Sequence, residues 1–538
     1  MFRRVALSAL MALLSPLLSI RAQGTGELTG SLESSSVYLF PDAEYGTQGY
    51  SWGSHNYLKL DWSRGHVAAG LQAEYHPRLW PGFPAEIEGI GLTGLYASWS
   101  GDLVEATAGS FYEQFGAGLV LRNWEDREIG MNNVLSGGRL VLRTPGRGAT
   151  LKLLGGMPRY GLLPRAATAV AGGDLSLDLL TLAGLDPAHS LVLEGSLVDR
   201  YSRETENDIL MLSQKGGFEV PAHLFSWSAR LQYAVAGFSL KWEYAGKGED
   251  FYLQRLPGLR EVPVSRGGNA MMLELNYARG SFSAALTLRR LENMGYRIFH
   301  TSGTPSSANT LNYLPALCMQ QTYMLASLNP YVTYADGEAG FQGDIYYTFR
   351  RGTPLGGRYG MRLHVGGSWI NALPSALPDR ETPYLAYRDI NMEAERMWSR
   401  KFRTILFVSI QENSPTHGNG KRTDAQNAFV LDALWRLTGT TSLRGELQYL
   451  YSQELSRDWM AALLEISAAP GFSFSVSDMY NHGDTRDHYF NVSAAYARHA
   501  MNLSLSAGRT REGMICSGGV CRWQPGYKGV SLRIQWSF

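Results

Sequence analysis

The chain has 538 residues, with 49 Lys and Arg against 48 Asp and Glu, so its formal net charge is +1. This balance argues against a general nucleic-acid binder, which carries a basic excess. The 60 Gly, 29 Tyr and 13 Trp residues suit an all-β protein with Gly-rich turns and aromatic residues at two water–lipid interfaces.

The N-terminal segment has the pattern of a secretory signal peptide. Arg3 and Arg4 precede an apolar stretch from Val5 to Ile20, and Ala22 stands at the predicted cleavage position. The predicted organisation is a signal peptide at residues 1–22 and an outer-membrane β-barrel at residues 23–538. Beyond residue 22 no stretch reaches the roughly 18 apolar residues of a membrane helix. A closed barrel also satisfies its backbone polar groups within lipid, so it remains available as a membrane-spanning fold.

Apolar and polar residues alternate along most of the chain, as in half-exposed β-strands. In FSLKWEY, residues 238–244, the apolar residues share one face and the polar residues the other; residues 443–451 and 501–508 behave alike. A soluble β-sandwich also alternates, but strands of about ten residues with aromatic ends match a tilted crossing of lipid. Because the polar face carries charges of both signs, it is expected to line water. The candidates for this lining are Lys59, Asp61, Lys241, Glu243, Glu274, Arg289, Arg444 and Glu446.

The connections between predicted strands are of two kinds, as in outer-membrane barrels with short periplasmic turns and long outer loops. The short turns lie at residues 63–65, 101–102, 144–148, 236–237, 279–280, 439–440 and 469–471. The long loops lie at residues 38–54, 77–88, 201–222, 248–268, 292–321, 414–426, 481–488 and 510–526. Counting in this way predicts a single large transmembrane antiparallel β-barrel of about 24 to 26 strands. The count is ambiguous between residues 335 and 386, where three segments resemble turns: GEAG (337–340), GTPLGG (352–357) and PSALPDRETPY (374–384).

The C-terminal sequence GVSLRIQWSF alternates without interruption and resembles the signal by which bacterial outer-membrane barrels are inserted. Its apolar face consists of Val530, Leu532, Ile534, Trp536 and Phe538. Closing the barrel removes both sheet edges, so this strand is predicted to pair with the first one, near residues 26–39.

Two polar segments are candidates for a functional role. Glu113, in GSFYEQFGAGLVLR, either lies on an inward constriction or marks a strand end with a glycine bulge. The segment HGDTRDH, with His482, Asp484, Asp487 and His488, offers ligands for a divalent cation or an Asp/His water-activating pair, although a solvated loop is the simpler interpretation.

The cysteines are interpreted through the oxidising compartment that an exported protein enters. Cys516 and Cys521 flank SGGV in the last long loop and are predicted to form a disulfide. Cys318 has no obvious partner and is expected to be free.

Segments NYLKLDW (residues 56–62), GSFYEQFGAGLVLR (109–122) and CSGGVCRWQPGYKG (516–529) resemble an uncharacterised outer-membrane β-barrel family of Bacteroidota. The resemblance runs from the first predicted strand to the C-terminus. It implies a barrel in the outer membrane of a Gram-negative cell, and it supplies no catalytic or binding residue.

Two functions remain open. The first is a porin-like passive or loop-gated pore or transporter for hydrophilic solutes. The alternative is a non-enzymatic barrel subunit of a secretion or assembly complex, or a surface scaffold.

An enzyme is not expected, because the sequence has no P-loop, GxSxG or HExxH motif, and no cofactor or metal is expected. The expected partners are outer-membrane lipid, the barrel-assembly machinery during biogenesis and, under the alternative, a secretion-complex protein. Strand-like alternation begins too early to leave room for a separate plug domain, so inward-folded loops at 201–222 or 292–321 would indicate gating.

Overall fold

The structure is a computed structural model, and it describes residues 26–46, 49–185, 188–204, 221–256, 260–300, 309–376, 382–414, 422–454, 456–517 and 520–538. The predicted signal peptide, residues 1–22, lies outside the described residues.

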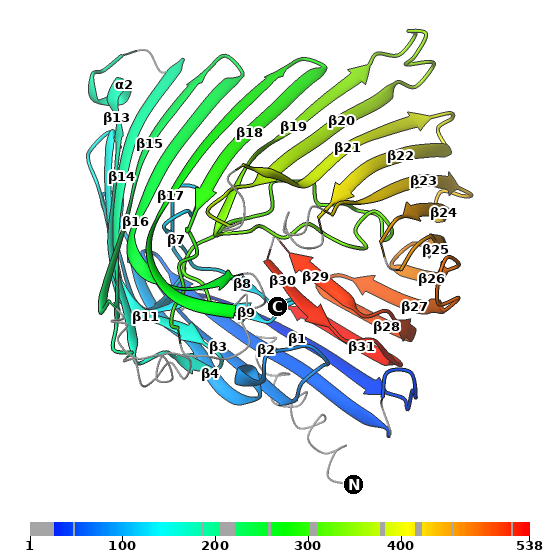
Figure 1. The fold of residues 1–538 in the computed structure, drawn as a ribbon, viewed down its shortest axis with the longest axis horizontal. Helices are drawn as coiled ribbons and strands as arrows, with labels where there is room; N and C mark the ends of the chain where they lie inside the picture. Colours follow the sequence, from blue (N-terminus) through cyan, green and yellow to red (C-terminus); the bar gives the residue numbers. More distant parts are fainter. Residues whose placement is uncertain are drawn as a thin grey trace.

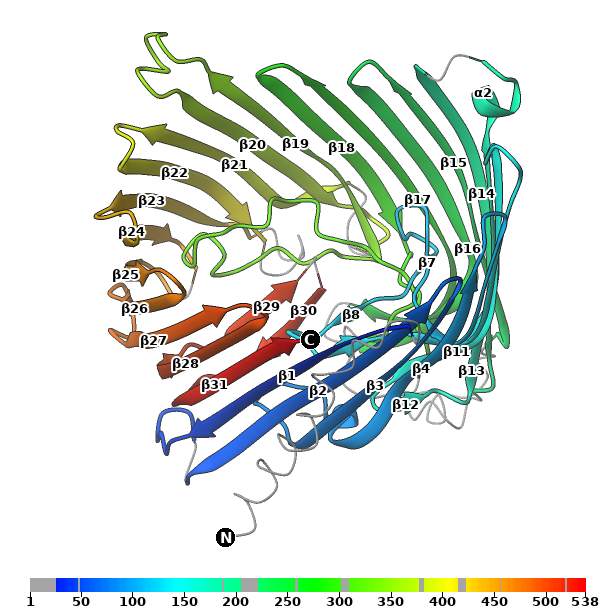
Figure 2. The ribbon, with the colours of Figure 1, turned by 180° about the vertical axis from the view of Figure 1, so that it is seen from behind.

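The chain forms a closed antiparallel β-barrel of 24 strands, as predicted. The strands form a ring in Figures 1 and 2, and each strand pairs with its neighbours along the chain. In chain order they are β1 (Glu27–Leu39), β2 (Ser51–Arg64), β3 (Val67–Arg78), β4 (Gly89–Ser100), β5 (Val104–Phe111), β10 (Leu135–Arg143), β11 (Ala149–Tyr160), β13 (Thr168–Asp178), β14 (His189–Ser202), β15 (His223–Val235), β16 (Phe238–Leu256), β17 (Arg260–Arg279), β18 (Phe282–Glu292), β19 (Gly337–Phe349), β20 (Met361–Ala372), β21 (Tyr384–Met397), β22 (Phe402–Asn413), β23 (Asp424–Arg436), β24 (Thr441–Ser452), β25 (Trp459–Ala468), β26 (Phe472–Asn481), β27 (His488–Arg498), β28 (Met501–Thr510) and β31 (Tyr527–Ser537).

Short elements lie in the connections between these strands. They are η2 (Ala85–Ile87), β6 (Gln114–Phe115), β7 (Leu121–Arg122), β8 (Glu125–Asp126), β9 (Met131–Asn132), β12 (Leu163–Pro164), α2 (Leu179–Leu182), β29 (Gly513–Ser517) and β30 (Val520–Gln524). Among the described residues, no helix is long and apolar enough to cross a membrane.

The barrel closes between its first and last strands. β31 pairs with β28 on one side and with β1 on the other, in the register that places Leu32 opposite Trp536. Gly30 and Phe538 extend this ladder, because the amide of each donates to the carbonyl of the other at 2.8 and 2.9 Å. The predicted pairing of the C-terminal strand with the first strand is therefore confirmed.

The two faces of the wall follow the alternation of the sequence. Large apolar side chains are exposed on the outside, as a lipid-facing surface requires; examples are Leu197, Trp227, Ile345, Phe429, Leu447, Leu464 and Phe474. Polar and charged residues between them face the interior. The ring is far too wide for its own side chains to fill, so other parts of the chain decide what the interior contains.

The ambiguous region of the sequence, residues 335–386, contains the hairpin of β19 and β20 and the connections that follow each of these two strands. The segment GEAG is not a turn but the start of β19, because Gly337 to Gly340 pair with the end of β18. The segment at residues 350–360 is a turn on the short-turn side, and residues 373–383 connect β20 to β21 at the opposite end. Twenty-four strands place both ends of the barrel chain on the short-turn side.

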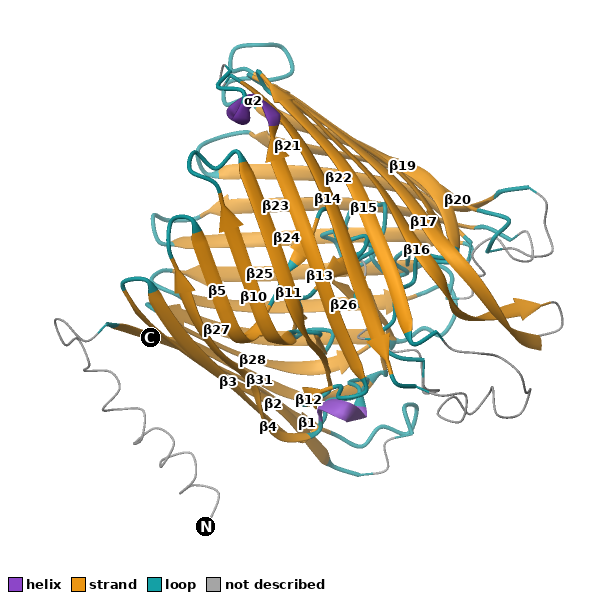
Figure 3. Cartoon of the chain, turned by 90° about the vertical axis from the view of Figure 1, so that its left-hand side faces the viewer, coloured by secondary structure: helices purple, strands orange, loops and turns teal. Residues whose placement is uncertain are grey.

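One predicted long loop is mostly strand. The expected loop at residues 248–268 is occupied by the ends of β16 and β17, which are 19 and 20 residues long. A register shift between Lys247 and Asp250 interrupts their ladder, and the hairpin projects beyond the neighbouring strands (Figure 3). Strands of about ten residues were expected, because lipid thickness sets strand length in a transmembrane barrel; β16 and β17 are about twice that length.

Candidate functional site: a lumen closed by two connections

Two connections fold into the barrel and form a plug. The first plug segment, residues 112–134, joins β5 to β10, and the second, residues 293–336, joins β18 to β19. Figures 1 and 2 show both inside the ring; the short strands β7, β8 and β9 belong to the first segment. Residues 301–308 of the second segment lie outside the described part.

The two plug segments are hydrogen-bonded to each other. The amide of Arg122 donates to the carbonyl of Leu311 at 2.8 Å, and the amide of Tyr313 donates to the carbonyl of Gly118 at 2.9 Å. The side-chain amide of Asn312 donates to the carbonyls of Leu119 and Met294 at 3.0 and 2.7 Å. The segments therefore form one unit, although almost two hundred residues separate them in the chain.

The plug is attached to the wall by an apolar cluster. From the plug it includes Phe115, Leu119, Leu121, Ile298 and Leu311, and from the inner wall it includes Leu154, Val170, Val198, Leu224 and Leu291. The sequence indicated inner faces without the large apolar residues of a packed core, which is wrong at this level of the barrel. The inner residues change from polar to apolar where the plug covers them, because burial against the plug removes them from water.

Charged groups also anchor the first plug segment. Glu113 accepts from the guanidinium of Arg139 at 2.5 Å and from the ammonium of Lys152 at 2.9 Å. Burial alone would raise the pKa of Glu113, but these two hydrogen bonds hold that pKa below its ordinary value. Glu113 thus follows a strand end, at Phe111, and also lies inside the lumen, so both interpretations of this motif were correct in part.

The second plug segment has a buried polar anchor. Asp250 lies 3.3 Å from the guanidinium of Arg200 and 3.0 Å from Nε2 of His300. The amide of His300 donates to Glu204 at 2.7 Å. All four side chains are almost completely buried, so these contacts join the plug to β14 and β16.

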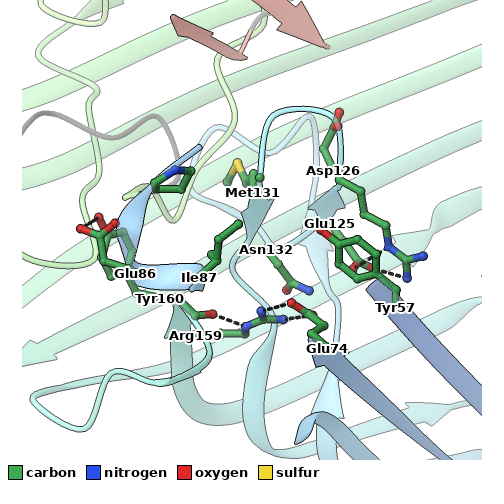
Figure 4. Close-up of a pocket in the computed structure, with 14 residues that line it drawn as sticks. Tyr57, Glu74, Glu86, Ile87, Glu125, Asp126, Met131, Asn132, Arg159 and Tyr160 are labelled. Carbon is green, nitrogen blue, oxygen red and sulfur yellow. Dashed lines mark hydrogen bonds and ion pairs between the residues drawn. The ribbon is translucent and has the colours of Figure 1, made fainter. Parts of the chain in front are cut away.

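Figure 4 shows the junction between the first plug segment and the wall on the β3 side. Arg159 forms a bidentate pair with Glu74, with both N–O distances 2.8 Å. Thr93 and Gln72 donate to the same carboxylate. The space left here is only about 20 Å³, about the volume that one water molecule needs, so this junction is packed closed.

A larger cavity lies on the short-turn side of the plug. Its volume is about 610 Å³, and its walls are the inner faces of β11 and of β13 to β17. The plug covers it with Gln114, Gly116 and Ala117 from the first segment and Tyr313 and Pro315 from the second. Its lining is mostly charged and polar. This cavity is the candidate functional site.

The sequence-based lumen candidates occupy different parts of the interior. Lys241, Glu243 and Glu274 line the cavity. Lys59 and Asp61 form an ion pair at 3.4 Å on the far wall.

Arg289 is paired with Glu338 at 2.6 Å under the second plug segment. Arg444 is paired with Glu446 and Asp432 at 2.5 and 2.9 Å on β23 and β24. The eight candidates therefore do not form one site.

Other candidates lie away from the cavity. Cys516 and Cys521 are joined by a disulfide between β29 and β30. Cys318 is free, and its apolar surroundings raise the pKa of its thiol to about 12.

In HGDTRDH, Asp487 pairs with Arg509 at 3.3 Å and His488 contacts Asp478. In the part of the chain that the structure describes, no three His, Cys, Asp or Glu side chains lie close enough together to hold a metal ion.

The first plug segment was not expected from the sequence. A signal was nevertheless present: Leu119, Val120 and Leu121 are three consecutive apolar residues, which breaks the alternation of a lumen-lining strand. Gly116 and Gly118 precede them with φ values of 55° and 90°, a conformation that glycine adopts readily. Together they turn the chain from the wall into the interior.

The model of a family described as "Family of unknown function (DUF6029)" matches residues 2–538. The chain belongs to this family. The DUF6029 match gives no activity, and an origin in Bacteroidota stays a prediction. No curated protein matches the sequence.

Several solved structures have a similar fold. The P pilus usher (PapC) translocation pore is 10% identical over 95% of this chain and 99% of that chain, with a TM-score of 0.43. The copper transporter OprC is 10% identical over 95% and 81%, with a TM-score of 0.42. A BenF-like porin from Pseudomonas fluorescens Pf-5 is 9% identical over 96% and 99%, with a TM-score of 0.38. Likeness at this level gives no argument about what this chain carries or binds.

Proposed function

We propose that this protein is an integral outer-membrane barrel of a Gram-negative cell that provides a loop-gated pathway for hydrophilic solutes. The exposed apolar outer surface supports the membrane position. The proposed role is passage and not catalysis. Its partners under this proposal are the surrounding lipid and, during biogenesis, the barrel-assembly machinery.

The observation that carries this proposal is a polar cavity lying directly below a plug built from two connections. The cavity of about 610 Å³ shows that the lumen is not packed solid, and the plug separates it from the long-loop end. Because the plug segments belong to connections and not to barrel strands, they can move without breaking the ladder that closes the wall.

The test compares single-channel conductance of two forms in planar bilayers. One is the intact chain, and the other has residues 309–330 replaced by a short Gly/Ser linker. The intact form is expected to conduct rarely and the trimmed form continuously. A control form with Asp484, Thr485 and Arg486 replaced by glycines, at the rim between β26 and β27, is expected to behave as the intact chain.

Silence of both the intact and the trimmed form would contradict the proposal. If a partner protein then co-purifies in a fixed ratio from native membranes, a role as a subunit of a secretion or assembly complex, or as a scaffold, replaces it.

A further inference from the structure

Most charged groups around the cavity are already paired. Lys152 is bound to Glu113 at 2.9 Å, and Arg230 is bound to Asp174 and, at 3.0 Å, to Glu194. These pairs belong to the wall or hold the plug, so they are not available to a solute.

Lys241 and Glu274 are different. They lie directly opposite each other on β16 and β17, and both line the cavity. No ion pair joins either of them to another residue of the described chain. Two opposite charges that face one cavity and are not ion-paired leave one cationic and one anionic position for a solute to occupy.

Glu243 adds a second anionic position. Its side chain is buried, with the residue only 5% exposed. Oε2 accepts from the amide of Ala117 at 2.8 Å. Oε1 is buried and accepts no hydrogen bond at ordinary distance from a described residue, while Arg230 and Ser228 lie close to the same carboxyl group. Glu243 lines the cavity, so a solute ammonium beside Glu274 would lie near a second carboxyl group.

Arg122 adds a second cationic position. Its guanidinium carbon lies 3.7 Å from the centre of the Tyr313 ring, and both residues line the cavity. Stacking on the ring orients the planar group. No carboxylate in the described part of the chain pairs with it.

We propose that the cavity binds a small zwitterionic solute, a free amino acid or a short peptide, with its ammonium toward Glu243 and Glu274 and its carboxylate toward Lys241 and Arg122. This inference rests on the proposed pathway function and names its substrate class. A neutral sugar would offer none of these four groups a charged partner. A solute of one sign would compensate only half of them, and complementary charge is what gives selectivity.

The experiment measures binding by calorimetry, with the full barrel in detergent and four probes. These are L-alanyl-L-alanine, its N-acetyl form, its C-terminal amide and the doubly blocked form. The dipeptide is expected to bind most tightly. Each singly blocked form should bind about tenfold more weakly, because each charge-assisted hydrogen bond contributes about that much.

Variants assign the two ends of the solute. Lys241→Gln should weaken binding of the dipeptide about tenfold and leave binding of the C-terminal amide unchanged. Glu274→Gln should weaken binding of the dipeptide similarly and leave binding of the N-acetyl form unchanged. The matched controls Lys59→Gln and Asp61→Asn, on the far wall, should leave all affinities unchanged. Heat-modifiable gel migration establishes that each variant is folded.

Absence of dipeptide binding to the folded wild-type barrel, or equal affinity for all four probes, overturns the inference. So does an equal loss in Lys241→Gln and Lys59→Gln. Conductance without binding overturns this inference and leaves the pathway intact, whereas binding without conductance in the trimmed form overturns the pathway alone.

Discussion

At the scale of single residues, the interior is organised by buried ion pairs. Glu74 and Arg159 are each almost fully buried, and they connect β3 to β11 beside the plug (Figure 4). Replacing one member leaves the other as an uncompensated buried charge, which costs more than the pair itself contributes. The sequence shows that both residues are polar, but not that they meet, because 85 residues separate them.

Arg159→Met is therefore expected to lower the free energy of unfolding by about 3–5 kcal/mol, measured by denaturant titration of the barrel in detergent. The double variant Arg159→Met with Glu74→Leu should recover part of this loss, because no charge then remains buried. Arg362→Met is the control, since the Arg362 side chain is 75% exposed in its pair with Glu395; its effect should stay below about 1 kcal/mol. Equal effects of Arg159→Met and Arg362→Met would contradict this account of the junction.

The two faces of a strand should respond differently to the same new charge. Leu505 faces outward near the middle of β28, and Ser504 faces the lumen. Leu505→Arg should destabilise the folded barrel in lipid vesicles by about 2–4 kcal/mol, whereas Ser504→Arg should change its stability little, because that side is wet. A similar loss in both variants would mean that the outer face of β28 does not meet lipid.

At the scale of elements, strands were predictable and the plug was not. Alternation is a local property, so each strand and its inward face can be read from about ten residues. The plug depends on contacts such as Arg122 with Leu311, and no local pattern encodes them. The same limit applies to the cavity. The sequence places Lys241, Glu243 and Glu274 on an inner face. Arg122 and Tyr313 belong to the plug segments, and only the folding of these segments brings them to the cavity.

Asn312 is expected to connect the two plug segments. It is 2% exposed, and Asn312→Ala would leave the buried carbonyls of Leu119 and Met294 without their donor, at roughly 1–3 kcal/mol for each. The expected result is faster cleavage of the plug by added protease and more frequent channel opening, with unchanged heat-modifiable migration of the barrel. Asn502→Ala, at an exposed lumen position on β28, is the control. Unchanged cleavage in Asn312→Ala would show that the segments are held by other contacts.

At the scale of the whole molecule, closure determines the architecture. An antiparallel ring requires an even number of strands if both ends lie on one side, and the ambiguous region between β18 and β21 could be settled only by pairing. Reading GEAG as a turn was reasonable because two glycines flank it, yet Gly340 is needed inside β19. A Cβ at this position would lie 2.2 Å from the carbonyl oxygen of Trp369. Close approach of neighbouring strands, which sequence alone does not reveal, explains that glycine.

Closure also joins the first and last strands of the wall at the seam between β1 and β31. Phe538 contributes two backbone hydrogen bonds with Gly30, and its ring covers the space where a Cβ of Gly30 would lie. Deleting Phe538 removes both bonds and exposes the edge of β1 at the short-turn end, and an unpaired edge in lipid is costly. The deletion is expected to reduce the amount of folded barrel in the outer membrane more than the amount exported, measured by fractionation and heat-modifiable migration.

Phe472→Ala removes an exposed aromatic ring at the start of β26, away from the seam, and should have a much smaller effect. Normal outer-membrane levels after deletion of Phe538 would show that the remaining ladder, from Ser31 paired with Ser537 to Leu39 paired with Gly529, closes the barrel without it.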